Sequence, residues 1–467
     1  MLSVLGFVGT LALITGLIHY YLWRRLVRDT TRPGRWRRIG AVAALVLGLL
    51  VPATLIGTRA GLYWLAWPGY LWLAVMFYLL VLLLLLEVPL LVARVVLRRR
   101  ENRVAPSPAP ATPALVGAAT TDHPGTDASG AADAADQTRS APTADQTGSV
   151  PTADRPEGAA TAAPATGDTG TDGSTEQAGG DPAPQPDHDP GRRLLLARSA
   201  AIFAGLTAVG ITGYGVRTAL GPLHLDRVQI PLAKLPRSMD GLRIATVADV
   251  HLGPLRGRVH TERMVAAINR LNADVVAVVG DLVDGTVAEL GEDAAPLRDI
   301  QSRHGNFFVT GNHEYYSGVE EWVEEVDRLG LRVLQNQREE IRAGGGVLDL
   351  AGVNDVSAAG TGVAAPADFG AALGDRDPSR PVVLLAHQPV AAFEAAKFGV
   401  DLQLSGHTHG GQIVPFNLAV RLEQPVVSGL GEVDGTKVYV TNGAGFWGPP
   451  VRVGAPPQIT LVELRSV

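Results

Sequence analysis

The sequence contains no cysteine. No disulfide can therefore cross-link any part of the chain, and no thiolate can act as a nucleophile or a metal ligand. A metal site in this protein has to be built from His, Asp, Glu or Asn. The chain also lacks an excess of positive charge, because 40 Lys+Arg stand against 46 Asp+Glu, a formal net charge of −6. This balance gives no overall footprint of nucleic-acid binding, which would want a basic domain, so no nucleic-acid partner is expected.

A third absence is local, because residues 104–191 contain hardly any large apolar side chain. The segment consists mainly of Ala, Pro, Thr, Gly and Asp, and it repeats the fragments ADQT and PTAD. Such a segment cannot bury enough apolar surface to offset the entropy lost when its chain is ordered. We therefore expect residues 104–191 to be a disordered linker between larger modules, since 467 residues exceed what one hydrophobic core usually supports.

The first hundred residues carry three long apolar runs, Leu2–Trp23, Ile39–Ile56 and about Tyr70–Val92. Each run is close to the roughly 20 residues that a helix needs to cross a bilayer. Trp64 and Trp67 lie near the start of the third run, as in an interfacial aromatic belt. Residues 1–103 are therefore predicted to form a membrane domain with three transmembrane helices, and the lipid bilayer is an expected partner.

A weaker apolar run, Ala200–Tyr214, comes after the linker and is preceded by Arg192 and Arg193. Two interpretations of residues 192–216 stay open: a fourth transmembrane helix with a basic flank, or a signal anchor that resembles a twin-arginine export signal. Both interpretations place residues 223–467 on the side of the membrane opposite to the arginines.

The distribution of basic residues predicts on which side of the membrane residues 223–467 lie. Seven arginines fill the loop after the first run, and four come after the third run, whereas the intervening loop carries only Arg59. By the positive-inside rule, the first loop and the stretch after the third run are cytoplasmic. The expected protein is a multi-pass protein of the cytoplasmic membrane, whose domain at residues 223–467 lies on the extracytoplasmic side.

Residues 223–467 alternate in the manner of an α/β protein. Short apolar runs such as VVAVVGD, VVLLAHQP and LQLSGH suit strands that are buried on both faces. Helical patterns, among them RMVAAINRLN and VEEWVEEVDRLG, lie between several of these runs. The alternation predicts a layered α/β architecture.

Side chains that can bind a metal come directly after five of these apolar runs. They are Asp249 and His251, then Asp281 and Asp284, then Asn312 and His313, then His387, and finally His407 and His409. Ligands of open α/β sheets bind beyond the carboxyl ends of the strands, so these residues are expected to converge on one edge. A mixed nitrogen and oxygen set without sulfur suits Mn, Fe or Zn better than Ca.

The ordered blocks DVH, GDLVD, GNHE, AHQ and GHTHGG closely resemble the calcineurin-like metallophosphoesterases. The resemblance covers roughly Leu242 to Leu464. The stretch GHTHGGQIVPF and the membrane-anchored layout resemble most the bacterial cell-envelope phosphodiesterase branch. The fold that this resemblance implies is a four-layer α/β/β/α sandwich.

The resemblance also implies two divalent metal ions. The ligand positions carried over are Asp249, His251 and His409 for one ion, Asn312, His387 and His407 for the other, and Asp281 as a bridge between them. Two such ions would lower the pKa of a bridging water and clamp an in-line displacement at phosphorus. By the same resemblance, His313 would donate a proton to the leaving oxygen or stabilise the transition state, and Asp284 would orient His313.

The sequence thus predicts a membrane-anchored, metal-dependent phosphoric ester hydrolase that cleaves a phosphodiester through a metal-bridging hydroxide. Envelope lipids, teichoic-type polymers and nucleotide-linked precursors are the expected substrate classes. The alternatives are a phosphomonoesterase or pyrophosphatase of the same fold, and a sensor that only binds a phosphorylated ligand. His224, His260 and His304 lie outside the blocks and are expected to be surface or structural residues, while Arg452 is a candidate phosphate contact. The oligomeric state is not predicted.

Overall fold

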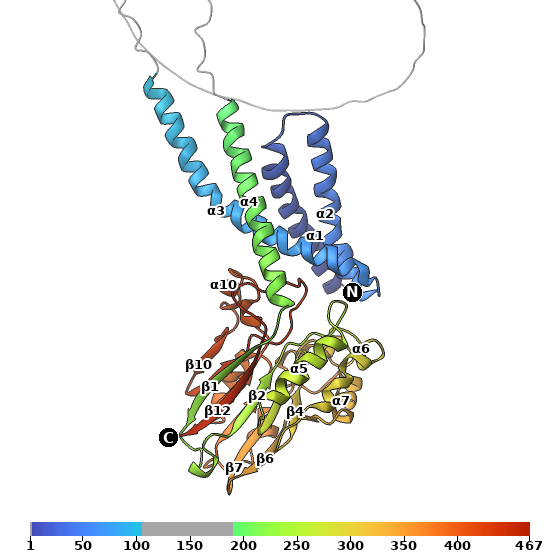
Figure 1. The fold of residues 1–467 in the computed structure, drawn as a ribbon, viewed down its shortest axis with the longest axis vertical. Helices are drawn as coiled ribbons and strands as arrows, with labels where there is room; N and C mark the ends of the chain where they lie inside the picture. The colour runs from blue at the N-terminus through green and yellow to red at the C-terminus, as the bar shows by residue number, and fades with distance from the viewer. Residues whose placement is uncertain (1, 105–189) are drawn as a thin grey trace, which may run out of the picture. The chain divides into compact units, whose positions relative to one another are not determined.

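The structure is a computed structural model that describes residues 2–104 and 190–467. The predicted linker at residues 104–191 lies outside the described residues except at its two ends. The described chain before residue 224 is helical (Figure 1). Its elements are α1 (Leu2–Trp23), the π-helix η1 (Arg24–Arg28), α2 (Arg35–Arg59), η2 (Tyr63–Leu65), α3 (Ala66–Val104) and α4 (Pro190–Ala219).

Three stretches of these helices are long and apolar enough to cross a membrane: Arg35–Arg59, Tyr63–Ala93 and Leu194–Ala219. They contain the second, third and fourth runs that the sequence singles out as spans. The first run forms α1 over Leu2–Trp23, and its role as a span stays a prediction.

The remainder of the chain contains two six-stranded sheets. In order across the first sheet, the strands are β1 (His224–Leu232), β12 (Gln458–Ser466), β2 (Arg243–Val247), β3 (Val275–Val279), β4 (Asn306–Val309) and β5 (Arg332–Val333). The second sheet contains β10 (Gly429–Val433), β11 (Thr436–Val440), β9 (Leu402–Ser405), β8 (Val382–Leu385), β7 (Gly346–Gly352) and β6 (Gln337–Ala343).

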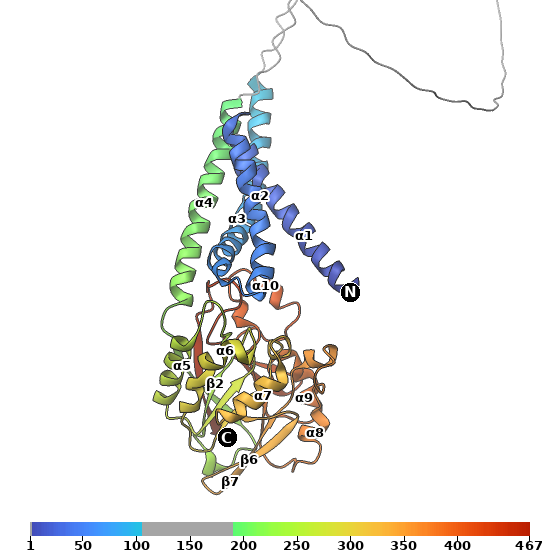
Figure 2. The same cartoon turned by 90° about the vertical axis from the view of Figure 1, so that its right-hand side faces the viewer.

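The two sheets pack face to face, and helices cover their outer faces (Figures 1 and 2). Ile244 and Val279 of the first sheet share one buried cluster with Leu350 and Leu404 of the second. Helices α5 (Arg258–Arg270), α6 (Val287–Ala294) and α7 (Val319–Arg328) cover the first sheet. Helices α8 (Phe369–Leu373) and α9 (Ala392–Lys397) lie on the second, and α10 (Asn417–Val420) comes after β9. The four-layer α/β/β/α fold is therefore confirmed.

The apolar pattern of the sequence explains the layers, and interruptions of that pattern explain why some strands were not predicted. All five residues of β3, Val275–Val279, are buried, as a strand covered on both faces requires. Helix α7 buries Val319, Trp322 and Val326 along one side of the helix. Strands β1, β6 and β10 have no matching prediction, because each is partly exposed and its apolar residues are interrupted by polar ones.

Strand direction brings the candidate ligands together. Strands β2, β3 and β4 run parallel to one another, and so do β8 and β9. The carboxyl ends of parallel neighbours share one edge of their sheet, so the loops after these five strands meet at one place.

Candidate metal centre

The structure brings all nine sequence-predicted site residues into one cluster, in which every residue except Asp284 is buried or half-buried. The loops after β2, β3 and β4 carry Asp249, His251, Asp281, Asp284, Asn312 and His313, and the loops after β8 and β9 carry His387, His407 and His409. Side chains from positions as distant as 251 and 409 come within 3.0 Å of each other. Three overlapping groups within the cluster could each hold a cation, and the group of His251, Asp281 and His313 shares one residue with each of the two groups described next.

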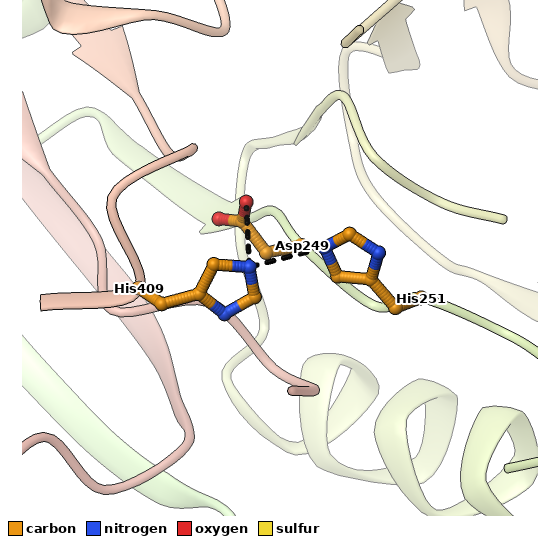
Figure 3. Close-up of side chains that lie close together, drawn as sticks. All are labelled: Asp249, His251 and His409. Atoms are coloured by element: carbon orange, nitrogen blue, oxygen red, sulfur yellow. Dashed lines mark hydrogen bonds and ion pairs between the residues drawn. The ribbon is translucent and has the colours of Figure 1, made fainter. Parts of the chain in front are cut away.

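The first group is Asp249, His251 and His409 (Figure 3). The Nε2 atoms of His251 and His409 lie 3.0 Å apart, and His409 Nε2 lies 3.6 Å from Asp249 Oδ1. All three side chains are buried. Two imidazole nitrogens and a carboxylate oxygen that converge on one point form a donor set typical of a transition metal or zinc.

The second group contains Asp281, His387 and His407, with Asn312 beside it. His387 Nε2 lies 3.1 Å from Asp281 Oδ2, and His407 Nδ1 lies 3.0 Å from Asn312 Oδ1. Asp281 Oδ2 also lies 3.7 Å from His251 Nε2 in the first group. One carboxylate therefore faces both groups.

Hydrogen bonds orient two of the imidazoles for a cation. His387 Nδ1 donates to the carbonyl oxygen of Val279 at 2.8 Å, which leaves the lone pair of its Nε2 pointing into the cluster. That buried Nε2 makes no hydrogen bond of good geometry among the described residues, although it lies 3.1 Å from Asp281 Oδ2. His251 Nδ1 bonds Asp284 Oδ1 at 2.9 Å, which turns its Nε2 towards His409 Nε2, 3.0 Å away. Such partners on the distal ring nitrogen are typical of metal-ligating histidines, so the residues fit a metal.

Burial keeps several of these rings neutral, as metal ligation requires. Burial and then the charge on His387 lower the pKa of His407 to about 3. Burial and the nearby Arg452 guanidinium hold the pKa of His409 well below its usual range. Burial works against ionisation of Asp281, yet His387, His313 and His251 hold the pKa of that carboxyl well below its usual range.

Two other pKa shifts indicate that the buried carboxylates of the cluster require nearby positive charge. Burial raises the pKa of Asp249 to about 7. Burial opposes protonation of His387, but the Asp281 carboxylate raises the pKa of that imidazole well above its usual range. Buried carboxylates require compensation, which either protons or cations can supply.

His313 stands at the open side of the cluster, with 18% of its side chain exposed. Its Nδ1 lies 2.7 Å from Asp284 Oδ1, and its Nε2 lies 4.0 Å from Asp281 Oδ2. Burial opposes protonation, but the hydrogen bond to Asp284 and the charge of Asp281 raise the pKa of His313 to about 9. Asp284 thus bonds two rings, His251 and His313, and can hold a proton on Nδ1 of each.

The loops adopt unusual backbone conformations where they turn the ligands inward. Asp249, His251, Asp281, His407 and His409 all have positive φ angles, between 47° and 70°. Such conformations cost free energy for residues other than glycine and persist where the surrounding structure fixes them. Five of the predicted ligands therefore occupy strained positions.

Two glycines allow the loops after β3 and β4 to approach each other. Gly280 has a φ of 76°, and a Cβ there would lie 2.6 Å from both Gly311 N and His387 Nδ1. A Cβ on Gly311 would lie 2.3 Å from Asp281 Oδ1. Any side chain at either position would displace a predicted ligand.

Glu314 has a role in the site that the sequence did not reveal. It is buried, and its carboxylate accepts hydrogen bonds from the backbone N–H groups of Asp281 (3.0 Å), Leu282 (2.8 Å) and Gly311 (2.6 Å). The side chain therefore ties the loop after β3 to the loop after β4. Its place directly after His313 was the one available signal, but nothing in the sequence names its three partners.

Arg452 is not accessible to a phosphate group, although the sequence suggested it as a candidate phosphate contact. Its guanidinium is fully buried and donates to the carbonyl oxygens of His409, Asn442 and Gly445. Its Nη2 also donates to His409 Nδ1 at 2.9 Å. Arg452 therefore fixes the ring and the loop of a predicted ligand from behind.

Two exposed aromatic side chains flank His313 on its open side. The ring centroids of Trp447 and Tyr316 each lie 6.0 Å from that of His313, in edge-on arrangements. More than half of each side chain is exposed. Gln412 fixes the Trp447 backbone, since it accepts from the Trp447 N–H at 2.9 Å and donates to its carbonyl oxygen at 2.9 Å. The entrance to the cluster is thus lined with aromatic surface.

Comparisons with known proteins agree with this geometry. A family model described as calcineurin-like phosphoesterase matches residues 242–411. A transmembrane protein with metallophosphoesterase domain from Danio rerio is 39% identical over 300 residues, which cover 59% of this chain and 68% of that protein. A metallophosphoesterase of Helicobacter pylori strain J99 is 37% identical over 277 residues, which cover 59% of this chain and 73% of that protein.

A solved purple acid phosphatase from yellow lupin seeds matches 50% of this chain and 55% of its own, with 12% identity and a TM-score of 0.29. The match to the family model begins at the strand before Asp249 and ends just after His409, so it contains all nine clustered residues. Together with the identity to the Danio rerio protein, it shows that the chain belongs to the calcineurin-like metallophosphoesterase family.

Proposed function

We propose that this protein is a membrane-anchored phosphodiesterase that uses two divalent metal ions and acts on the extracytoplasmic side of the cytoplasmic membrane. The observation that carries the proposal is the position of Asp281, whose Oδ2 lies 3.1 Å from His387 and 3.7 Å from His251. A carboxylate that faces two separate ligand groups is suited to bridge two cations.

Each ion has a candidate set of ligands in the chain. Asp249, His251 and His409 would hold one ion, and Asn312, His387 and His407 would hold the other, with Asp281 shared. Mn, Fe or Zn suits these ligands. When bound, the pair would supply Lewis acidity that activates water and neutralises charge on the phosphoryl oxygens.

The other residues of the cluster orient catalytic groups or transfer a proton. Asp284 accepts a hydrogen bond from His313 Nδ1 and so fixes the ring, whose Nε2 lies 4.0 Å from Asp281 Oδ2. From there His313 would donate a proton to the leaving oxygen of the substrate. Arg452 and Glu314 would hold the ligand loops in place without touching the substrate.

Three observations support the choice of substrate and place. The block GHTHGGQIVPF resembles a branch of phosphodiesterases, three stretches of helix could span a membrane, and relatives are named as transmembrane proteins. Those relatives include vertebrate proteins, so the assignment to a bacterial cell-envelope branch belongs to the proposal. The substrate classes that fit are envelope lipids, teichoic-type polymers and nucleotide-linked precursors, each offered at or near the bilayer surface.

The test is a comparison of two chromogenic substrates with the full chain in a mild detergent. The purified protein would be supplied with Mn, Fe or Zn, and its turnover of a phosphodiester would be measured beside that of the matching monoester. Asp281→Asn removes the shared carboxylate, while Asp327→Asn on α7 makes the same chemical change at an exposed position. Diester turnover that survives Asp327→Asn and collapses with Asp281→Asn is the expected result.

Other outcomes would select the alternatives. Faster turnover of the monoester would favour a phosphomonoesterase or pyrophosphatase of the same fold. No turnover by folded, metal-loaded protein with any of the three metals would favour a sensor that only binds its phosphorylated ligand.

The orientation has a separate test, which the absence of native cysteine makes simple. Glu320→Cys introduces one thiol at an exposed position on α7. In intact cells, an impermeant maleimide should label this thiol. Labelling that requires opened cells would place the domain in the cytoplasm instead.

A further inference from the structure

A cavity of about 640 Å³ lies beside α5, away from the residues assigned to the metal centre. The segment that leads from the end of α4 into β1 forms one wall, with Leu220 and Leu223. Arg256 and α5 form the other wall, with His260, Arg263 and Arg270. Leu223 packs against the core under α5, so this segment is part of the folded domain. The cavity thus combines an apolar wall with four basic side chains.

Arg256 is the unusual member of this set because it is buried with no carboxylate at ion-pair distance, although the charge of Asp284 acts on it from further away. Within the described residues it makes no ion pair with a carboxylate. Its Nε and Nη2 donate to the carbonyl oxygen of His251 at 3.3 and 2.9 Å, and its guanidinium carbon lies 3.5 Å from the ring centroid of Phe446. Nη1 is buried and has no hydrogen-bond partner in the described chain. A buried cation with unused N–H groups is costly unless an anion satisfies it.

His260 adds a second unsatisfied group to the same cavity. Its Nε2 is buried and makes no hydrogen bond of good geometry among the described residues, although the backbone of Ala444 interacts with the ring. Burial, followed by the charges of Arg256 and Arg263, lowers the pKa of His260 to about 3. The ring is therefore neutral and can bond a hydroxyl or a phosphate oxygen that carries a proton.

The rim of the cavity supplies further positive charge. Arg263 and Arg270 are exposed on α5, and neither pairs with a carboxylate in the part of the chain that the structure describes. Arg258 on the same helix differs, because it bonds Glu262 at 3.0 Å and does not line the cavity. The unpaired arginines of α5 are thus those that face the cavity.

We propose that this cavity binds a phosphate-bearing anion, which lies between Arg263 and Arg270 and is attracted by the buried charge of Arg256. Guanidinium groups are well suited to phosphate oxygens. Only residues 220–223 separate the candidate span Leu194–Ala219 from β1, so the site opens where the chain leaves a bilayer. Leu220 and Leu223 offer apolar contacts to the glycerol or acyl part of a phospholipid.

The site is separate from the metal centre but connected to it. The guanidinium that would attract the anion also holds the backbone carbonyl of His251, a predicted metal ligand. An occupant of the cavity would therefore stabilise the position of His251. The site does not depend on the proposed phosphodiesterase activity, since its ligand would bind without reacting.

Binding can be measured by calorimetry on the full chain in a neutral detergent. The probes are short-chain phosphatidylglycerol, short-chain phosphatidylcholine and inorganic phosphate. The test variant is Arg263→Gln with Arg270→Gln, and Arg258→Gln is the control for loss of charge on the same helix. We expect the double variant to bind phosphatidylglycerol roughly tenfold more weakly or worse, and the control to change by less than about twofold. Arg263→Lys with Arg270→Lys should keep most of the affinity.

Any contribution of the metal centre to binding is common to all variants, so the difference between them reports the cavity. Phosphatidylglycerol that outbinds inorganic phosphate would identify a lipid ligand. Inorganic phosphate that binds as well, with the same dependence on Arg263 and Arg270, would identify a free phosphate. The proposal is wrong if the folded double variant binds phosphatidylglycerol like the unchanged chain. It is also wrong if Arg258→Gln causes an equal loss, or if phosphatidylcholine binds as tightly.

Discussion

The two sheets contribute different chemistry to the same cluster. The loops after β2, β3 and β4 of the first sheet bring every carboxylate and the amide of Asn312. The loops after β8 and β9 of the second sheet bring imidazoles alone, from His387, His407 and His409. Replacing a carboxylate of the first sheet should therefore alter the fixed negative charge of the site, whereas replacing an imidazole of the second should alter the number of nitrogen ligands.

The largest effect is expected from Asp281→Asn, which removes the one carboxylate that faces both ligand groups. Loss of this charge should weaken both metals and lower kcat/KM by about 10³-fold, equivalent to about 4 kcal/mol of transition-state stabilisation. Metal analysis by mass spectrometry, beside the kinetics, checks this. Full metal content with unchanged turnover would mean that Asp281 is not a shared ligand.

His387→Ala tests the second sheet, because the Nε2 of this ring faces the cluster 3.1 Å from Asp281 Oδ2. The variant should lose the metal of the second group and keep that of the first, with turnover down about 10²-fold. The ratio of metal to protein, measured after dialysis, separates the two groups. Loss of both metal ions together would show that the two ligand groups do not bind metal independently.

Arg452→Gln tests how His409, a predicted ligand in the loop after β9, is held in position. The guanidinium donates to the Nδ1 and the carbonyl oxygen of His409, so its loss should let the ring move. Metal affinity should fall by roughly tenfold, because the loop that carries His409 loses a buried donor to its carbonyl oxygen. Arg452→Lys keeps the charge but not the fork of donors, and should recover little of the affinity. Recovery by lysine would show that charge, rather than orientation, is what matters.

The smallest effect on chemistry is expected from Glu314→Gln in the first sheet. The carboxylate accepts three backbone hydrogen bonds, whereas a carboxamide presents one acceptor oxygen. Leaving a buried N–H unpaired should destabilise the fold by about 1–3 kcal/mol. Chemical or thermal unfolding measures this loss, and Glu320→Gln on the exposed face of α7 is the matched control. Equal unfolding midpoints for the two variants would contradict the role assigned to Glu314.

Much of the site could be predicted because its residues come directly after the strands that place them. An apolar run such as Val275–Val279 marks a buried strand, and the polar residue directly after it marks the edge of the sheet. Asp249, Asp281 and His387 were found in this way. The same reasoning could not find partners that lie far along the chain, such as Arg452 behind His409.

The amino-acid sequence by itself determined the layers, the candidate spans and the order of the polar blocks. Those features depend on local patterns, in which apolar runs form strands or helices and polar residues interrupt them. Only the tertiary structure decided which imidazole faces which carboxylate, and which residues hold them from behind. Arg452, Glu314 and Arg256 owe their roles to burial beside particular backbone groups. The free energy of such a contact depends on what the folded chain places there, and no local pattern encodes that.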